Sequence, residues 1–426
     1  VCGPNLLLSS GVLTLKVPMA EKRLETIRAQ QHVVLDYTNE EQRIHATGGQ
    51  ALYSLASGLL EVTQHPVWQT DLRQGGGDKI LLDRTNEIFR ALGQAWLRMQ
   101  VPAKGGAGFL PQLDLLATNT SAPASQVVEV HCDNYEFRTN SAVFSRHVHL
   151  VQRAGTGPEG TLDCERLSVA FTGSNQVQRL VAEQGVVLAQ QDKAFTGSRA
   201  VYTPTNGWLE LTGHPAWRAG LRQGKGDLLL VNLTNSELIV RGNASMRVPS
   251  REIVPAGASG PLAPKASALK GATNQFADIF AEDYTLRRDH DRLLTHFRGG
   301  VYISHTQMNL MCASMTVRTP LEANRGNSVM TADQDVQFDL LDDHNQKHHG
   351  TGDRLVFTHS VTPTATNDIA VLTGTPALLQ STNGPSARNN SFTLDLRRGT
   401  IRGSGAYQFT GFTAPLNTNK FKWPKK

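Results

Sequence analysis

The chain has 426 residues, a formal net charge of +5 at pH 7 and 19% charged residues. It is longer than one ordinary domain, and its 39% of hydrophobic residues are enough for an extended core, so a disordered chain is excluded as the default. Aromatic residues make up only 6%, and long amphipathic helical patterns are missing, whereas alternating Val, Leu and Thr bounded by Asn, Asp and Gly recur throughout. This pattern predicts an all-β protein.

The first apolar segment, residues 6–17, has the length of a signal-peptide core but lacks a basic start and a small-residue cleavage site. It aligns instead with residues 309–317, which lie inside a later repeat. We therefore expect the chain to begin part-way through a repeat, with any export signal upstream of residue 1. No stretch reaches the ~18 apolar residues of a membrane helix, so a membrane-spanning chain is not expected.

Tandem repeats organise the sequence. Residues 50–95 align without a gap with residues 199–244, and both contain Ala-x-Tyr, then Thr-x-His-Pro-x-Trp and Leu-Arg-Gln-Gly-x-Gly-Asp. A weaker copy with an insertion covers 353–406. We expect a unit over 1–102 that lacks its front strands, a linker over 103–126, a unit over 127–249, a linker over 250–274, a unit over 275–412 and a basic tail over 413–426.

Within the units, apolar residues alternate with polar ones, and polar turns follow at short, regular intervals, so successive strands should be antiparallel with one face buried. No short block can cover its own apolar face, and blocks should therefore stack into a solenoid-like, elongated core of two facing sheets, with both linkers outside the ladder. The residues expected to line this interior are Val148, Leu150, Leu167, Val169, Val186, Leu188, Val201, Leu209, Leu211, Leu238 and Val240.

The repeated strand pattern carries a family resemblance. Small-x-x-Ala-x-Tyr, then Leu-x-Leu-Thr-Gly-x-Pro, an Asp-led strand and Val-x-Gly-x-Ala, seen best at 199–244, resemble the OstA-like domain of lipopolysaccharide-transport proteins, the LptA family. The resemblance implies an elongated antiparallel β-jellyroll open along a seam, whose apolar lining holds the acyl chains of lipopolysaccharide. It also implies a periplasmic location and end-to-end strand pairing with other jellyroll proteins. The expected docking edge is the strand near residues 401–410, beside the basic tail.

Several other motifs suggest phosphate, metal or catalytic sites but also fit turns or core packing. The glycine-rich segments 74–78 and 223–227 lack the spacing of a phosphate loop and predict turns. Asp342, Asp343 and His344 with His348 and His349 suggest a metal cluster, but the corresponding segments of other repeats have no histidines, which favours a polar turn. The His-Pro pairs lack a nearby nucleophile, and Trp68 and Trp217 are expected to pack in the core. No catalytic residue, cofactor, metal or nucleic-acid partner is predicted.

Four cysteines are too few for a disulfide scaffold of this length. Repeat alignment predicts that Cys132, Cys164 and Cys312 are small inward-facing residues. A bridge between Cys132 and Cys164 needs a favourable cross-strand geometry and stays open at this point.

The leading hypothesis is thus a non-enzymatic carrier or bridge for an amphipathic lipid. The main alternative is a structural or adhesive β-solenoid scaffold with a filled core, and a glycan-processing enzyme ranks third because no paired carboxylates stand out. The state of the interior separates the first two, since a carrier needs accessible apolar lining and a scaffold needs a closed, packed interior.

Overall fold

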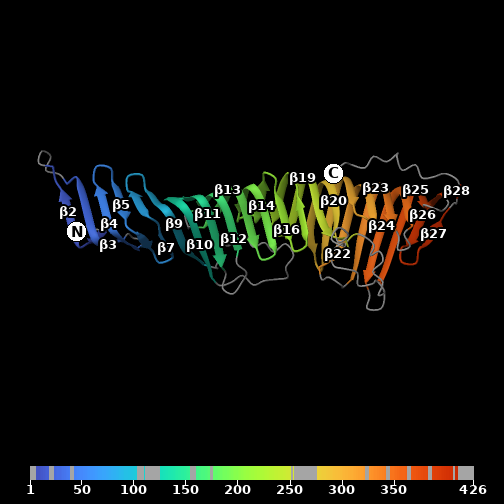
Figure 1. Cartoon of the computed structure of the whole chain (residues 1–426), viewed down its shortest axis with the longest axis horizontal. Helices are drawn as coiled ribbons and strands as arrows, with labels where there is room; N and C mark the ends of the chain where they lie inside the picture. Colours follow the sequence, from blue (N-terminus) through green and yellow to red (C-terminus); the bar gives the residue numbers. More distant parts are fainter. Residues whose placement is uncertain are drawn as a thin grey trace, which may run out of the picture. The chain divides into compact units, whose positions relative to one another are not determined.

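The structure is a computed structural model. It describes residues 6–18, 24–38, 43–102, 110, 125–153, 160–172, 176–250, 253, 276–321, 326–341, 346–361, 366–381, 386–405 and 408–410. In these residues every regular element is a β-strand (Figure 1), and the strands pair antiparallel with their neighbours, which confirms the all-β antiparallel class. The contacts divide the chain into two compact units: Val1–Trp217 with Leu230–Thr234, and Arg218–Leu229 with Asn235–Lys426.

Unit 1 holds most of the first half of the strands. They are β1 (Leu6–Ser9), β2 (Val12–Lys16), β3 (Thr26–Thr38), β4 (Arg43–Ser54), β5 (Leu59–Thr63), β6 (Val67–Gln69), β7 (Arg73–Gly76), β8 (Lys79–Asp83), β9 (Ile88–Pro102), β10 (Ser125–Arg138), β11 (Ser141–Arg153), β12 (Gly160–Phe171), β13 (Val177–Gln190), β14 (Lys193–Thr203) and β15 (Trp208–Thr212). The division between the units falls inside β16 (Ala216–Ala219) and β18 (Leu228–Asn232).

Unit 2 holds the remaining strands. They are β17 (Arg222–Lys225), β19 (Glu237–Pro249), β20 (Phe276–Asp289), β21 (Arg292–Ser304), β22 (Met308–Pro320), β23 (Gly326–Leu341), β24 (Lys347–Val361), β25 (Thr366–Ser381), β26 (Ser386–Asp395), β27 (Thr400–Ser404) and β28 (Gln408–Thr410). The three repeat units expected from the sequence stay a prediction, because a division by contacts does not test a division by repeats.

Within each unit, consecutive long strands pair with their neighbours in the chain. In unit 1 the ladder passes from β9 to β10 and on through β11, β12, β13 and β14. In unit 2 it passes from β19 to β20 and on through β21 to β26. Such nearest-neighbour pairing is what stacked β-blocks require, because each block covers the apolar edge of the one before it.

Long strands turn a corner near their middle, where the pairing register shifts. In β3, β9, β11, β13, β19, β21 and β23 the corner contains two consecutive left-handed residues, for example Arg146 and His147 in β11 or Gln184 and Gly185 in β13. Left-handed backbone is strained for most residues other than Gly, and here it is found at these corners and in turns between strands, such as those at Gly58 and Gly207. Because of the corner, the two halves of each strand belong to two layers.

Two rungs of unit 1 consist of separate half-strands instead of one long strand. β5 and β6 pair with the two halves of β4, and the corner between them contains Gln64 and His65, both left-handed, followed by Pro66. β7 and β8 pair with the two halves of β9, and Gly77 and Asp78 form their corner. The recurrent His-Pro and glycine-rich motifs are therefore corner sequences of the fold.

Candidate functional site

The interior of unit 1 is lined by rows of side chains that lie directly opposite one another from strand to strand. Layer 1 is the layer that contains the Ile88–Leu92 half of β9. We call the row of layer 1 that lies nearest the ends of the strands the seam row. The row runs, in order of pairing, through Ile27, Tyr53, Leu60, Leu82, Phe89, Phe137, Ala142, Val169, Leu180, Tyr202 and Leu209. Every member carries an apolar or aromatic side chain.

Layer 2, which contains the Ala95–Pro102 half of β9, presents a matching row. Its members are, in order of pairing, Leu35, Ala46, Trp68, Gly75, Leu97, Val130, Leu150, Leu162, Leu188 and Phe195. Together the two rows make a continuous apolar lining across the strands of unit 1.

An aromatic cluster joins the two layers. Trp68 of layer 2 donates its indole N–H to the hydroxyl of Tyr135 in layer 1 at 2.7 Å, and its ring meets Phe89 edge-on at 5.2 Å between centroids. Burial raises the pKa of Tyr135 above its ordinary range. Gly75, on the strand beside Trp68, makes room for this pair, because a Cβ there would lie 2.6 Å from the Tyr135 hydroxyl. This close approach accounts for a glycine in the segment that superficially suggests a phosphate loop.

The burial of the seam row changes along its length. From Ile27 to Phe137 its members are half-buried, whereas from Ala142 to Leu209 they are buried. Neighbouring strands lie about 4.8 Å apart, so the half-buried part spans about 24 Å. In unit 2 the corresponding row is buried from Leu238 to Leu394 and ends at Ile401, which is 42% exposed. Accessible apolar lining of the seam row is thus concentrated in the first rungs of unit 1.

The residues predicted to line the interior are placed as follows. Val148, Leu150, Leu167, Val169, Val186, Leu188, Leu209, Leu211, Leu238 and Val240 are all buried. The prediction for Val201 is wrong. Val201 lies on the outer face, because its neighbours Ala200 and Tyr202 in β14 are buried. The misassignment arose because an outward Val continues the apolar pattern. Whether the buried residues contact lipid remains a prediction.

A residue of the first linker packs against the ends of β11 and β12. Leu110 is buried, and the side-chain amide of Gln152 binds its backbone on both sides: the Leu110 N–H donates to Gln152 Oε1 at 2.6 Å, and Gln152 Nε2 donates to the Leu110 carbonyl at 3.4 Å. Gly160, opposite Gln152, leaves space for the leucine. The linkers were expected outside the strand ladder; Leu110 and Ile253 belong to no strand, yet both are buried.

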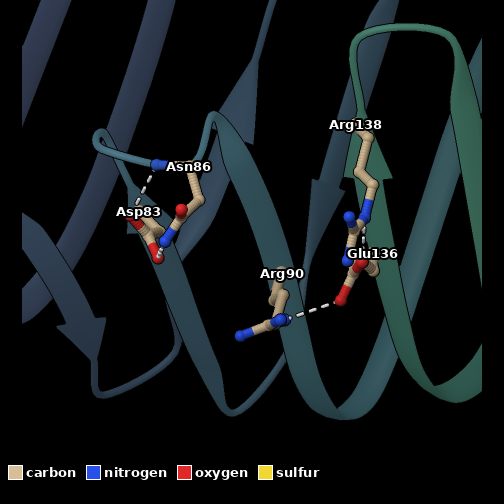
Figure 2. Close-up of polar contacts among 5 residues, drawn as sticks. All are labelled: Asp83, Asn86, Arg90, Glu136 and Arg138. Carbon is tan, nitrogen blue, oxygen red and sulfur yellow. Dashed lines mark hydrogen bonds and ion pairs between the residues drawn. The ribbon is translucent and has the colours of Figure 1, made fainter.

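The outer face of layer 1 is held by polar contacts. Glu136 of β10 accepts hydrogen bonds from Arg90 Nε at 2.7 Å and from Arg138 Nε at 2.6 Å (Figure 2). Partial burial acts to raise the pKa of Glu136, but the two arginines outweigh it and hold this pKa below its ordinary value. Near them, Asp83 caps its turn by accepting the backbone and side-chain N–H groups of Asn86.

Two surface pockets of unit 1 are polar or shallow and lie outside the interior. The larger, about 500 Å³, lies along the corners of β11 to β14 and contains Glu183 with Arg166 and Arg199 at 3.9 and 3.5 Å. The smaller, about 230 Å³, lies on the outer face and includes the misassigned Val201. Neither contains a residue of the seam row.

The remaining sequence candidates have structural roles. Trp68 and Trp217 are buried, as expected. His348 Nδ1 lies 2.8 Å from Ser381 Oγ, and His349 Nδ1 lies 2.8 Å from Asp339 Oδ1. Asp342 to His344 lie outside the described residues. Among the described residues no three metal-binding side chains gather, and no helix there is long and apolar enough to cross a membrane.

The three cysteines in the described part of the chain are free thiols. Cys132, Cys164 and Cys312 are unbonded to one another and buried, as expected of small inward residues. Cys132 and Cys164 donate to backbone carbonyls two residues further on. Burial raises the pKa of all three thiols to about 12. The open possibility of a Cys132–Cys164 disulfide is therefore wrong.

At its N-terminal edge, unit 1 exposes apolar side chains on a strand that the described residues pair on one side only. Leu13 and Leu15 of β2 lie opposite Ala29 and Ile27 of β3, so they continue the inner face, and they are 40% and 51% exposed. At the edge of unit 2, β27 and β28 pair with β26. Strand edges of this kind are templates for pairing with a further strand.

No protein-family model matches the chain, and no curated protein matches it. Among solved structures, the chain is similar to LptH, described as the LptA-homologous periplasmic component of the lipopolysaccharide transport device from Pseudomonas aeruginosa. The match has 15% identity and a TM-score of 0.23, and it covers 32% of this chain and 81% of the LptH chain.

Proposed function

We propose that this protein is a non-enzymatic carrier for an amphipathic lipid, and that the acyl chains lie along the half-buried part of the seam row. The observation that carries the proposal is the in-register row Tyr53, Leu60, Leu82, Phe89 and Phe137, which combines apolar chemistry, continuity across strands and partial exposure to solvent. Each methylene that leaves water against this row contributes about 0.8 kcal/mol. A lipid chain of ordinary length would therefore gain several kcal/mol.

The finer proposal is that the lipid is lipopolysaccharide and that the chain is part of a periplasmic bridge between the inner and outer membranes. Its support is the OstA-like pattern at 50–95 and 199–244, which falls on β4 to β9 and on β14 to β19. The edge at β27 and β28 would then pair with a strand of another jellyroll protein.

A scaffold with a filled core is the second candidate, and a specific observation favours it for unit 2. There the row from Leu238 to Leu394 is buried throughout, with large side chains such as Phe357 and Met330 closely packed. We assign lipid carriage to unit 1 and a mainly structural role to unit 2.

Equilibrium binding of lipopolysaccharide to the delipidated full chain tests the carrier function. Leu60→Asn and Leu82→Asn place an amide in the seam row and should weaken binding about tenfold each, which corresponds to about 1.4 kcal/mol of lost apolar contact. Leu55→Asn is the matched control, since Leu55 lies in an exposed turn of the same unit. If the wild-type chain binds no lipopolysaccharide, or if all three variants bind like it, the scaffold interpretation stands instead.

A further inference from the structure

The guanidinium of Arg73 lies beside the half-buried part of the apolar interior of unit 1. Arg73 lies on β7 directly opposite Met99, which is buried, and two residues before the inward-facing Gly75. The alternation of the strand therefore directs Arg73 inward. Its guanidinium carbon stands 6.0 Å from the centre of the Phe137 ring, and Phe137 is the last half-buried residue of the seam row. One charged side chain thus faces the open part of the row from the opposite layer.

This charge is not compensated within the described part of the chain. The main-chain N–H and carbonyl of Arg73 bind the Thr70 hydroxyl, but the described residues provide no carboxylate for the guanidinium, whose contact there is the aromatic face of Phe137. Desolvation accordingly lowers the pKa of Arg73. Arginine is normally paired when it leaves water, so an unpaired, half-buried guanidinium destabilises the protein and calls for a partner.

The arginine is part of a hairpin that the sequence uses twice. In unit 1 the tip residue Leu72 is 55% exposed and precedes the inward Arg73. In unit 2 Leu221 is 62% exposed and precedes Arg222, which lies two residues before Gly224, opposite the buried Met246. An exposed apolar tip followed by an inward cation suits a ligand that has both an apolar chain and an anionic group.

We propose that Arg73 binds the anionic head group, a phosphate or a carboxylate, of an amphipathic lipid whose chain lies on the seam row beside Phe137 and Phe89. The inference rests on the proposed carrier function and identifies the chemical class of its ligand. A guanidinium offers two parallel N–H groups to either oxyanion, and the low polarity around Phe137 strengthens that contact. The head group would take the place of the missing carboxylate.

Fluorescence quenching tests this assignment in the full chain, because Trp68 lies in contact with Phe89. The probes are dibrominated stearic acid, the corresponding brominated phosphatidic acid and the corresponding neutral monoacylglycerol. Arg73→Gln should weaken binding of at least one anionic probe about tenfold and change binding of the neutral probe less than about twofold. Arg73→Lys should recover part of the affinity, since it keeps the charge but not the bidentate geometry. Arg84→Gln, at an exposed arginine of the same unit, is the control.

The two anionic arms identify the head group: a loss confined to phosphatidic acid indicates phosphate, and a loss for both indicates a general oxyanion site. Unfolding by urea provides a second readout, in which Arg73→Gln should be at least as stable as wild type because it removes an uncompensated charge. Unchanged binding of both anionic probes, or an equal loss for the neutral probe, would overturn the inference while leaving the carrier function standing. Failure of the wild-type chain to bind any of the three lipids would overturn the carrier function and the inference with it.

Discussion

Gly75→Ala tests the close approach of the two layers of unit 1. A Cβ on Gly75 would lie 2.6 Å from the Tyr135 hydroxyl, 2.7 Å from Trp68 Nε1 and 2.9 Å from the Trp96 carbonyl oxygen. Ordinary contacts begin near 3.4 Å, so the Trp68–Tyr135 hydrogen bond and the β9 backbone must both move. Overpacking of this kind costs about 1–3 kcal/mol. We expect that fall in the free energy of unfolding, measured by urea denaturation followed by far-ultraviolet circular dichroism.

Gly160→Ala is the matched control, because a Cβ there meets Leu110 Cδ1 at an ordinary 3.8 Å. Replacing a strand glycine without a clash should leave stability unchanged or raise it by about 0.5 kcal/mol. In the double variant Gly75→Ala, Tyr135→Phe, loss of the hydroxyl should remove part of the added cost, so the two effects should not be additive. Equal stability of Gly75→Ala and wild type, or equal losses for both glycines, would show that the layers do not meet at Trp68 and Tyr135 as described.

Three further predictions concern stability and the thiols. Glu136→Gln should be less stable than wild type at pH 7, and in thermal melts the difference in stability should shrink as pH falls below about 4. The reason is that a carboxylate with a lowered folded-state pKa stabilises the fold only while it is ionised. A difference in stability that persists at about pH 2 would refute this. Leu110→Ala should cost about 2–5 kcal/mol in urea denaturation, whereas Leu72→Ala at an exposed site should cost less than about 0.5 kcal/mol, and equal effects would contradict the buried position of Leu110. In a Cys2→Ser background, the thiols of Cys132, Cys164 and Cys312 should react with a disulfide reagent slowly when folded and fully in urea, and fewer than three reactive thiols after unfolding without reductant would indicate a disulfide.

Much of the architecture of the chain could be predicted from its sequence, since strand alternation fixes which side chains face inward wherever polar residues separate the apolar ones. Leu209 and Leu211, with Glu210 between them, are such a case, and both are buried. Val201 fails because an outward Val between Ala200 and Tyr202 gives no polar signal. The pattern therefore becomes ambiguous where both faces of a strand carry apolar residues.

The corners and the interior charge were harder to predict. His65 and Gln64 form a left-handed corner between half-strands, yet a histidine followed by proline also fits an ordinary strand end. Arg73 was missed as a site residue because an arginine near a glycine-rich turn is usually solvated. The available signal was its recurrence, since Leu72-Arg73 and Leu221-Arg222 stand at the same place in the two best copies.

Site-specific photo-crosslinking to lipopolysaccharide along the seam row is the most direct test of the carrier function. A photoreactive amino acid placed at Leu60 or Phe89 should capture the lipid, while the same group at the outward neighbours Glu61 and Arg90 should capture little, because neighbouring residues of a strand face opposite sides. Leu150 and Leu209, which are buried, should give weaker capture than Phe89. Equal capture at Phe89 and Arg90, or none at Leu60 and Phe89, would contradict the proposal that acyl chains lie on this row.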